Sequence, residues 1–160
     1  MIEKELTEKL LKFLRDYLNF YKSFLEIESE KYNDLANNNV TTLDGHVRKE
    51  EAFMLKARGL ELERDKLVAQ TGSPKATFRQ LIPMFEPSLQ PQAKSIFDEL
   101  SQVTLDLKEI NLRCNQLTEL KLHRIEKDVS KLKNNPELQR IYSSKAEEGS
   151  TPPSILSKKV

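Results

Sequence analysis

The feature that most constrains the fold is a regular alternation of four and three residues between apolar positions near the N-terminus. These positions are Leu6, Leu10, Phe13, Tyr17, Phe20, Phe24 and Ile27. Such spacing places an apolar row along one side of a helix. A second row runs beside it, at Leu11, Leu14, Leu18, Tyr21 and Leu25. A stripe two rows wide needs two neighbouring helices, or one neighbour and a partner chain, to cover it.

The chain predicts three long helices separated by breaks. The first covers about residues 2–36 and ends at the asparagines of residues 37–39. The second covers about residues 42–70. Thr41 is its predicted N-terminal cap, and Asp44, three residues later, is expected to accept a hydrogen bond from the backbone of the cap. A proline-rich connector over residues 71–90 follows, with one short helical turn at most. The third helix covers about residues 91–133, from a proline suited to a first turn to the sequence NNP.

Composition supports this view, because charged residues make up 32% of the chain, tryptophan is absent and there are only four glycines. We therefore predict an all-α fold, an elongated antiparallel three-helix coiled-coil bundle over residues 1–133 with a long C-terminal helix. Residues 134–160 are predicted to form a flexible, mostly disordered tail. The pair Ile155 and Leu156 within it is either a small docking cluster or a chance occurrence.

The charge balance argues against several classes of partner. Lysine and arginine (26) nearly cancel aspartate and glutamate (25), which disfavours nucleic acid and membrane insertion. Cys114 is the only cysteine, so an internal disulfide is excluded and a reducing compartment is favoured. The charged N-terminus is typical of neither a signal peptide nor a membrane span. We expect a cytoplasmic protein.

Residues capable of catalysis or metal binding are sparse. His46 and His123 fall on different predicted helices without ligand-spaced partners, and both are interpreted as surface histidines. The sequence contains no glycine-rich phosphate-binding motif. We therefore expect neither an enzyme nor a cofactor or metal. A rival hypothesis, an enzyme or metalloprotein that uses either histidine, predicts metal binding or a rate that falls on substitution.

The apolar row of the third helix changes direction along its length. Its first part is Ile96, Leu100, Val103, Leu107, Ile110, Cys114 and Leu117. A new row, displaced by one position, follows at Leu122, Ile125, Val129 and Leu132, and we call it the C-terminal row. One position on a helix corresponds to about 100°. We therefore expect the C-terminal row to contact something other than the first two helices.

Asn111 and Asn115 lie four residues apart, and each follows a residue of the first row. One interpretation is architectural, in which the amides bond to neighbouring side chains or fix the register of the bundle. The other is recognition of a partner helix. Spacing alone favours the architectural interpretation.

At these residues the sequence resembles a known family. The segment EINLRCNQL, residues 109–117, is similar to the last long helix of the FlgN-type flagellar export chaperones. The segment LDGHVRKEEAFMLKARGLELERDKL, residues 43–67, is similar to the second helix of that family, and YKSFLEIESEKYNDL, residues 21–35, fits the first. The order of helix, helix, proline connector, long helix and tail agrees over most of residues 5–142.

The resemblance implies a cytoplasmic chaperone that binds the terminal helix of hook-filament junction proteins, also called hook-associated proteins. Such a chaperone prevents their premature assembly and delivers them to the flagellar export gate. The partner-binding residues would be Asn111, Asn115, Leu122, Ile125, Val129, Leu132, Ile141 and Tyr142. Tyr142 matches a family tyrosine associated with the gate, although Ser143 stands where many members have glycine. Packing of Tyr142 on the bundle is the alternative.

A structural coiled-coil scaffold remains the alternative to a chaperone. Such a protein would form homo-oligomers through the stripe of the first helix. It predicts a tight homodimer whose affinity survives deletion of residues 134–160. The sequence is compatible with a homodimer in either case.

Overall fold

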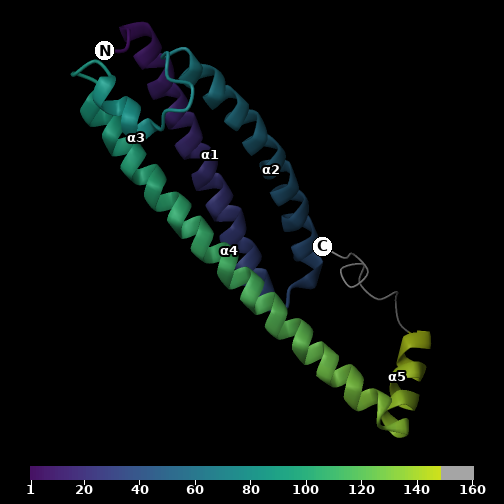
Figure 1. Ribbon diagram of the computed structural model, residues 1–160. Helices are drawn as coiled ribbons and strands as arrows, with labels where there is room; N and C mark the ends of the chain where they lie inside the picture. The colour runs from purple at the N-terminus through teal and green to yellow at the C-terminus, as the bar shows by residue number, and fades with distance from the viewer. Residues whose placement is uncertain (149–160) are drawn as a thin grey trace. The chain divides into compact units, whose positions relative to one another are not determined.

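The computed structural model describes residues 1–148, apart from the side chains of Leu138, Tyr142 and residues 145–148. Within this range every regular element is a helix, and the prediction of an all-α helical bundle is confirmed (Figure 1). The long helices are α1 (Lys4–Ala36), α2 (Val40–Ala69) and α4 (Gln90–Lys133). The shorter elements are α3 (Phe78–Leu81), the 3-10 helix η1 (Ile82–Met84) and α5 (Pro136–Glu148).

The chain divides into two compact units. The N-terminal unit is Met1–Cys114, and the C-terminal unit starts at Asn115, so the division falls within α4. The apolar pattern predicts one bundle over residues 1–133, whereas the compact N-terminal unit ends near the middle of the third long helix. Each unit is described by itself below.

Helix α1 lies between α2 and α4 in the N-terminal unit (Figure 1). On one side, Phe20 and Phe24 stack against Phe53 of α2, with ring centroids 5.4 and 5.6 Å apart. On the other side, Lys22 forms an ion pair with Glu99 of α4. The apolar stripe of α1 is two rows wide because two helices cover it.

The core of the N-terminal unit is built mainly from both rows of α1. Its buried members are Leu10, Leu11, Phe13, Leu14, Tyr17, Leu18 and Phe20. Helix α4 adds Leu100 and Val103, two residues of the predicted first row. Helix α2, which is described throughout, adds only Val68 as a fully buried residue, and its apolar residues Val47 and Met54 are exposed.

The connector between α2 and α4 is part of the core. Phe78, Leu81, Ile82 and Phe85 are all buried, and the ring of Phe78 stacks 6.0 Å from that of Phe13. The short turn expected in this segment forms as α3. Its start is capped because the Thr77 amide donates a hydrogen bond to Gln80 Oε1 at 3.0 Å.

Helix α2 starts two residues before the predicted position. Asn38 adopts a positive φ of 57°, a conformation that asparagine tolerates better than most residues. The turn between α1 and α2 is therefore completed at Asn39, and Thr41 lies inside α2 rather than at its cap. The Thr42 hydroxyl instead donates to the Asn39 carbonyl at 3.1 Å.

A helix of 13 residues, α5, forms where the sequence analysis expected a flexible tail with at most one helical turn. The reason is local: the Asn135 side chain accepts a hydrogen bond from the Glu137 amide at 3.2 Å, and Pro136 occupies the first helical position. Asparagine and proline are favoured at these positions. The sequence NNP thus ends α4 and also starts α5. Ile155 and Leu156 lie outside the described residues.

Candidate partner-binding surface

The two histidines occupy different environments. His46 Nε2 lies 2.6 Å from Asp34 Oδ2, and His46 Nδ1 lies 3.5 Å from Glu30 Oε2. The prediction of a surface position is therefore wrong for His46, which helps to join α2 to α1. His123 is exposed. Among the described residues, no group of three or more histidine, cysteine or acidic side chains has an arrangement that could hold a metal ion.

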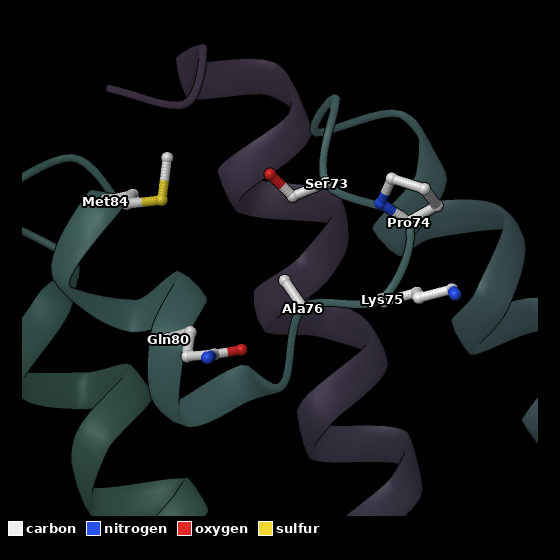
Figure 2. Close-up of a pocket in the computed structure, with 6 residues that line it drawn as sticks. All are labelled: Ser73, Pro74, Lys75, Ala76, Gln80 and Met84. Atoms are coloured by element: carbon white, nitrogen blue, oxygen red, sulfur yellow. The ribbon is translucent and has the colours of Figure 1, made fainter.

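A hollow in the N-terminal unit lies beside the connector. It is lined by Ser73, Pro74, Lys75, Ala76, Gln80 and Met84, which Figure 2 shows as sticks. Ser73 and Lys75 are the two side chains among these six that could act as nucleophiles, and none of the six is a histidine or a carboxylate.

A buried ionic cluster joins the C-terminal half of α1 to α2. Lys31 Nζ lies 2.9 Å from Glu28 Oε2 and 2.9 Å from Glu50 Oε2. The Glu28 side chain is only 1% exposed, and its burial raises the pKa of its carboxyl group, while Lys31 opposes the rise. The sequence alone does not reveal this cluster, because Glu28 and Lys31 have the character of ordinary solvent-facing residues of a charged helix. Their spacing of three residues on one helix face was the available signal.

The C-terminal row is exposed along most of its length. The exposed fractions of Leu122, Ile125 and Val129 are 45%, 43% and 43%, and Leu132 is half-buried. By contrast, the first row of α4 is buried or half-buried from Ile96 to Cys114. Helix α4 thus carries an apolar surface of its own within the C-terminal unit.

Both asparagines are exposed to solvent, Asn111 in the N-terminal unit and Asn115 in the C-terminal unit. Neither is buried as a register-fixing asparagine inside the bundle would be. Asn115 also has a relation to the C-terminal row that sequence analysis missed. It lies seven residues before Leu122, with Thr118 between them, so it continues the spacing of three and four residues.

Ile141 and Tyr142 lie on α5, between Pro136 and Glu148. Ile141 is 49% exposed. Only the backbone of Tyr142 belongs to the described part of the chain. The structure thus places both residues on a helix and leaves the binding role of each as a hypothesis.

The stripe of α1 is occupied within the chain. Leu10, Leu14 and Leu18 are buried against other elements of the N-terminal unit. A scaffold that forms homo-oligomers through the first helix needs this stripe on its surface. The structure therefore gives that alternative no available interface on α1.

No helix in the described part of the chain combines the length and the apolar character of a membrane span.

Comparison with known proteins identifies the family. The family model described as FlgN protein matches residues 1–149. Neither the curated proteins nor the solved structures contain a match. Because the family model matches more than half of the chain, this protein belongs to the FlgN family, a family of flagellar export chaperones.

Proposed function

We propose that this protein is a cytoplasmic export chaperone that binds the terminal helix of hook-filament junction proteins. It prevents their assembly before export and delivers them to the flagellar export gate. Family membership supports the general role. The single observation that carries the binding role is the exposure of the C-terminal row on a helix whose preceding row is covered.

The C-terminal row has the chemistry of a groove that captures an amphipathic helix. A cargo helix that packs its apolar face on Leu122, Ile125 and Val129 removes three large side chains from water. Each contributes roughly 1.5–3 kcal/mol when fully buried. This burial offsets part of the entropy cost of ordering the cargo segment. Asn115, which continues the spacing of the row, supplies an amide for polar contacts at the N-terminal end of the row.

Calorimetric titration tests the binding role. The ligand is a synthetic peptide of the C-terminal helix of a hook-filament junction protein from the same organism. We expect micromolar or tighter binding that is lost in Leu122→Asp/Ile125→Asp, because two carboxylates would have to be buried without partners. Leu120→Asp is the matched control, since Leu120 is exposed in the same helix but lies off the row. It should bind as the wild type does.

Two results would reject the binding role. One is the absence of heat at every accessible peptide concentration. The other is equal binding by the row variant and the wild type, which would place the cargo on another surface.

A further inference from the structure

A second recess of the N-terminal unit lies between α2, the connector and α4, and we call it the cleft. Its volume is about 330 Å³, and its walls are apolar and largely aromatic, formed by Tyr17, Val68, Phe78, Phe97 and Leu100. An α-helix with its side chains is about 10 Å across, so a recess of this size suits one large side chain and a short piece of backbone. We propose that the cleft binds an aromatic side chain of an extended partner peptide, which carries an acidic residue next to the aromatic one.

The aromatic wall is held in place by the rest of the core. The ring of Phe78 stacks on that of Phe13 with centroids 6.0 Å apart, and the ring of Phe13 stacks on that of Tyr17 at 5.3 Å. The Tyr17 hydroxyl donates a hydrogen bond to Glu61 Oε1 at 3.1 Å, so this buried polar group has its partner within the chain. Rings fixed before binding lose little entropy when a ligand arrives, and an inserted ring pairs favourably with them.

The charges at the rim of the cleft favour an acidic neighbour. Arg64 is already compensated, because its Nη2 lies 3.1 Å from Asp65 Oδ1 and its Nη1 lies 3.6 Å from Glu61 Oε1. Lys75 also lines the cleft, is exposed, and forms no ion pair with any other residue that the structure describes. A carboxylate next to the inserted ring supplies the counter-charge that Lys75 lacks.

The cleft adjoins the hollow beside the connector, which favours a linear peptide over a free aromatic acid. Pro74, Lys75 and Ala76 line both recesses. Figure 2 shows Lys75 on this shared stretch, with its side chain pointing away from Gln80 of the hollow. A peptide anchored in the cleft can continue across the connector, where the side chains of Ser73 and Gln80 offer hydrogen bonds to its backbone.

A fluorescent peptide tests the site with the full chain. The probe is the acetylated and amidated hexapeptide Gly-Ser-Trp-Asp-Gly-Ser. The chain contains no tryptophan, so the tryptophan emission comes from the probe alone. We expect a shift to shorter wavelength and a dissociation constant on the order of 0.1–1 mM, since few atoms make contact. The same peptide with asparagine for aspartate should bind about threefold more weakly. No shift at any accessible concentration, or equal binding of the two peptides, would overturn the inference.

Filling the cleft should abolish binding. Ala76 is half-buried in the lining, and Ala76→Leu places a larger side chain there, so the probe should bind at least about tenfold more weakly. Ala69→Leu is the matched control, because Ala69 is exposed on α2 and does not line the cleft. Circular dichroism and urea unfolding establish that both variants are folded. Undiminished binding by a folded Ala76→Leu chain would place the probe elsewhere and overturn the inference.

A charge reversal on the exposed rim tests the site without changing the core. Lys75→Glu should prefer the peptide with lysine for aspartate over the original probe, because the attractive pair is restored with its signs exchanged. Lys66→Glu makes the same change at an exposed position of α2 outside the lining and should keep the wild-type preference. An unchanged preference in Lys75→Glu would contradict the assignment of the acidic neighbour.

This inference does not rest on the proposed function. No residue of the C-terminal row lines the cleft. Leu122→Asp/Ile125→Asp should therefore bind the probe as the wild type does, and Ala76→Leu should bind the cargo peptide as the wild type does. Loss of probe binding in the row variant would place the probe on the C-terminal row and overturn the inference. Probe binding without any cargo binding would support the cleft and reject the proposed function.

Discussion

Glu28 brings a carboxylate into the interior of the N-terminal unit. Its side chain contacts Lys31 one turn later in α1, and Lys31 also contacts Glu50 of α2. Removing one charge from such a buried cluster leaves the others without compensation, which costs more than the intact cluster contributes. The cluster therefore makes the fold sensitive to the loss of its single cation.

The substitution Lys31→Met tests this sensitivity. At pH 7 we expect it to lower the free energy of unfolding by about 3 kcal/mol, because two carboxylates then remain with no cation between them. Glu28→Gln is the matched control and should cost less, since Lys31 keeps Glu50 as its partner. Urea unfolding measures both values. Equal effects of the two substitutions would contradict the prediction.

The same variant has a predictable pH dependence. Burial raises the pKa of Glu28 above its ordinary value of 4.5, so the folded state holds this proton more tightly than the unfolded state. Such a carboxyl favours the fold at low pH, and this contribution is lost as the pH rises through 4.5 and the higher folded pKa. The destabilisation by Lys31→Met should therefore shrink as the pH falls through the raised pKa of Glu28 towards 4.5. Unfolding measured at several pH values tests this.

Tyr142 is the residue proposed to act at the export gate. Its place on α5, outside the C-terminal row, separates it in sequence from the residues proposed to bind cargo. Tyr142→Ala should therefore weaken binding of the chaperone to the cytoplasmic domain of the gate at least about tenfold, the typical effect of removing an aromatic anchor. Cargo peptide should bind unchanged. Pull-down and calorimetry measure the two events, and an unchanged gate affinity would favour a structural role for the ring.

At the scale of elements, α1 contributes more buried apolar side chains to the core than any other helix of the N-terminal unit. Leu14 has no exposed surface and lies in the second apolar row, between the elements that cover it. Leu14→Ala should lower the free energy of unfolding by about 2–5 kcal/mol, the usual range for a leucine replaced by alanine in a core. Leu55→Ala on α2 is the control, because Leu55 is 70% exposed and its loss should cost no more than about 0.5 kcal/mol. Urea unfolding compares the two.

The sequence predicted the long helices well because their signal is periodic. The two rows of α1 and the first row of α4 each repeat many times, so a local irregularity does not hide them. The start of α2 was less predictable, since it depends on the backbone of a single residue, Asn38. Helix α5 was missed because the same three residues, NNP, are a stop signal for one helix and a start signal for the next.

Prediction of the candidate site was limited for a different reason. Displacement of the C-terminal row by one position was visible in the sequence, and three of its four residues are exposed in the structure. The burial of Glu28 was not predictable, because it depends on Glu50 and Lys31 meeting across two helices. Long-range contacts between polar residues leave no periodic trace along the chain.

At the scale of the whole molecule, the buried apolar cluster of the described residues belongs to the N-terminal unit. Its members run from Ile2 to Val103, and none of them lies beyond Cys114. A chain shortened to residues 1–117 should therefore fold, with a free energy of unfolding within about 1 kcal/mol of the full chain. It should also lose cargo binding. Circular dichroism during urea unfolding measures stability, and a broad, non-cooperative transition would contradict the prediction.

Cys114 is the last residue of the N-terminal unit, and its sulfur lies 3.8 Å from the carbonyl oxygen of Glu28. The thiol is buried, and burial raises its pKa, so little reactive thiolate is available to reagents in the closed state. Because it is the only cysteine in the chain, alkylation in native buffer has one target. The rate at which Cys114 is alkylated therefore reports how often α4 separates from α1 at this position, so this thiol is a built-in probe of local opening.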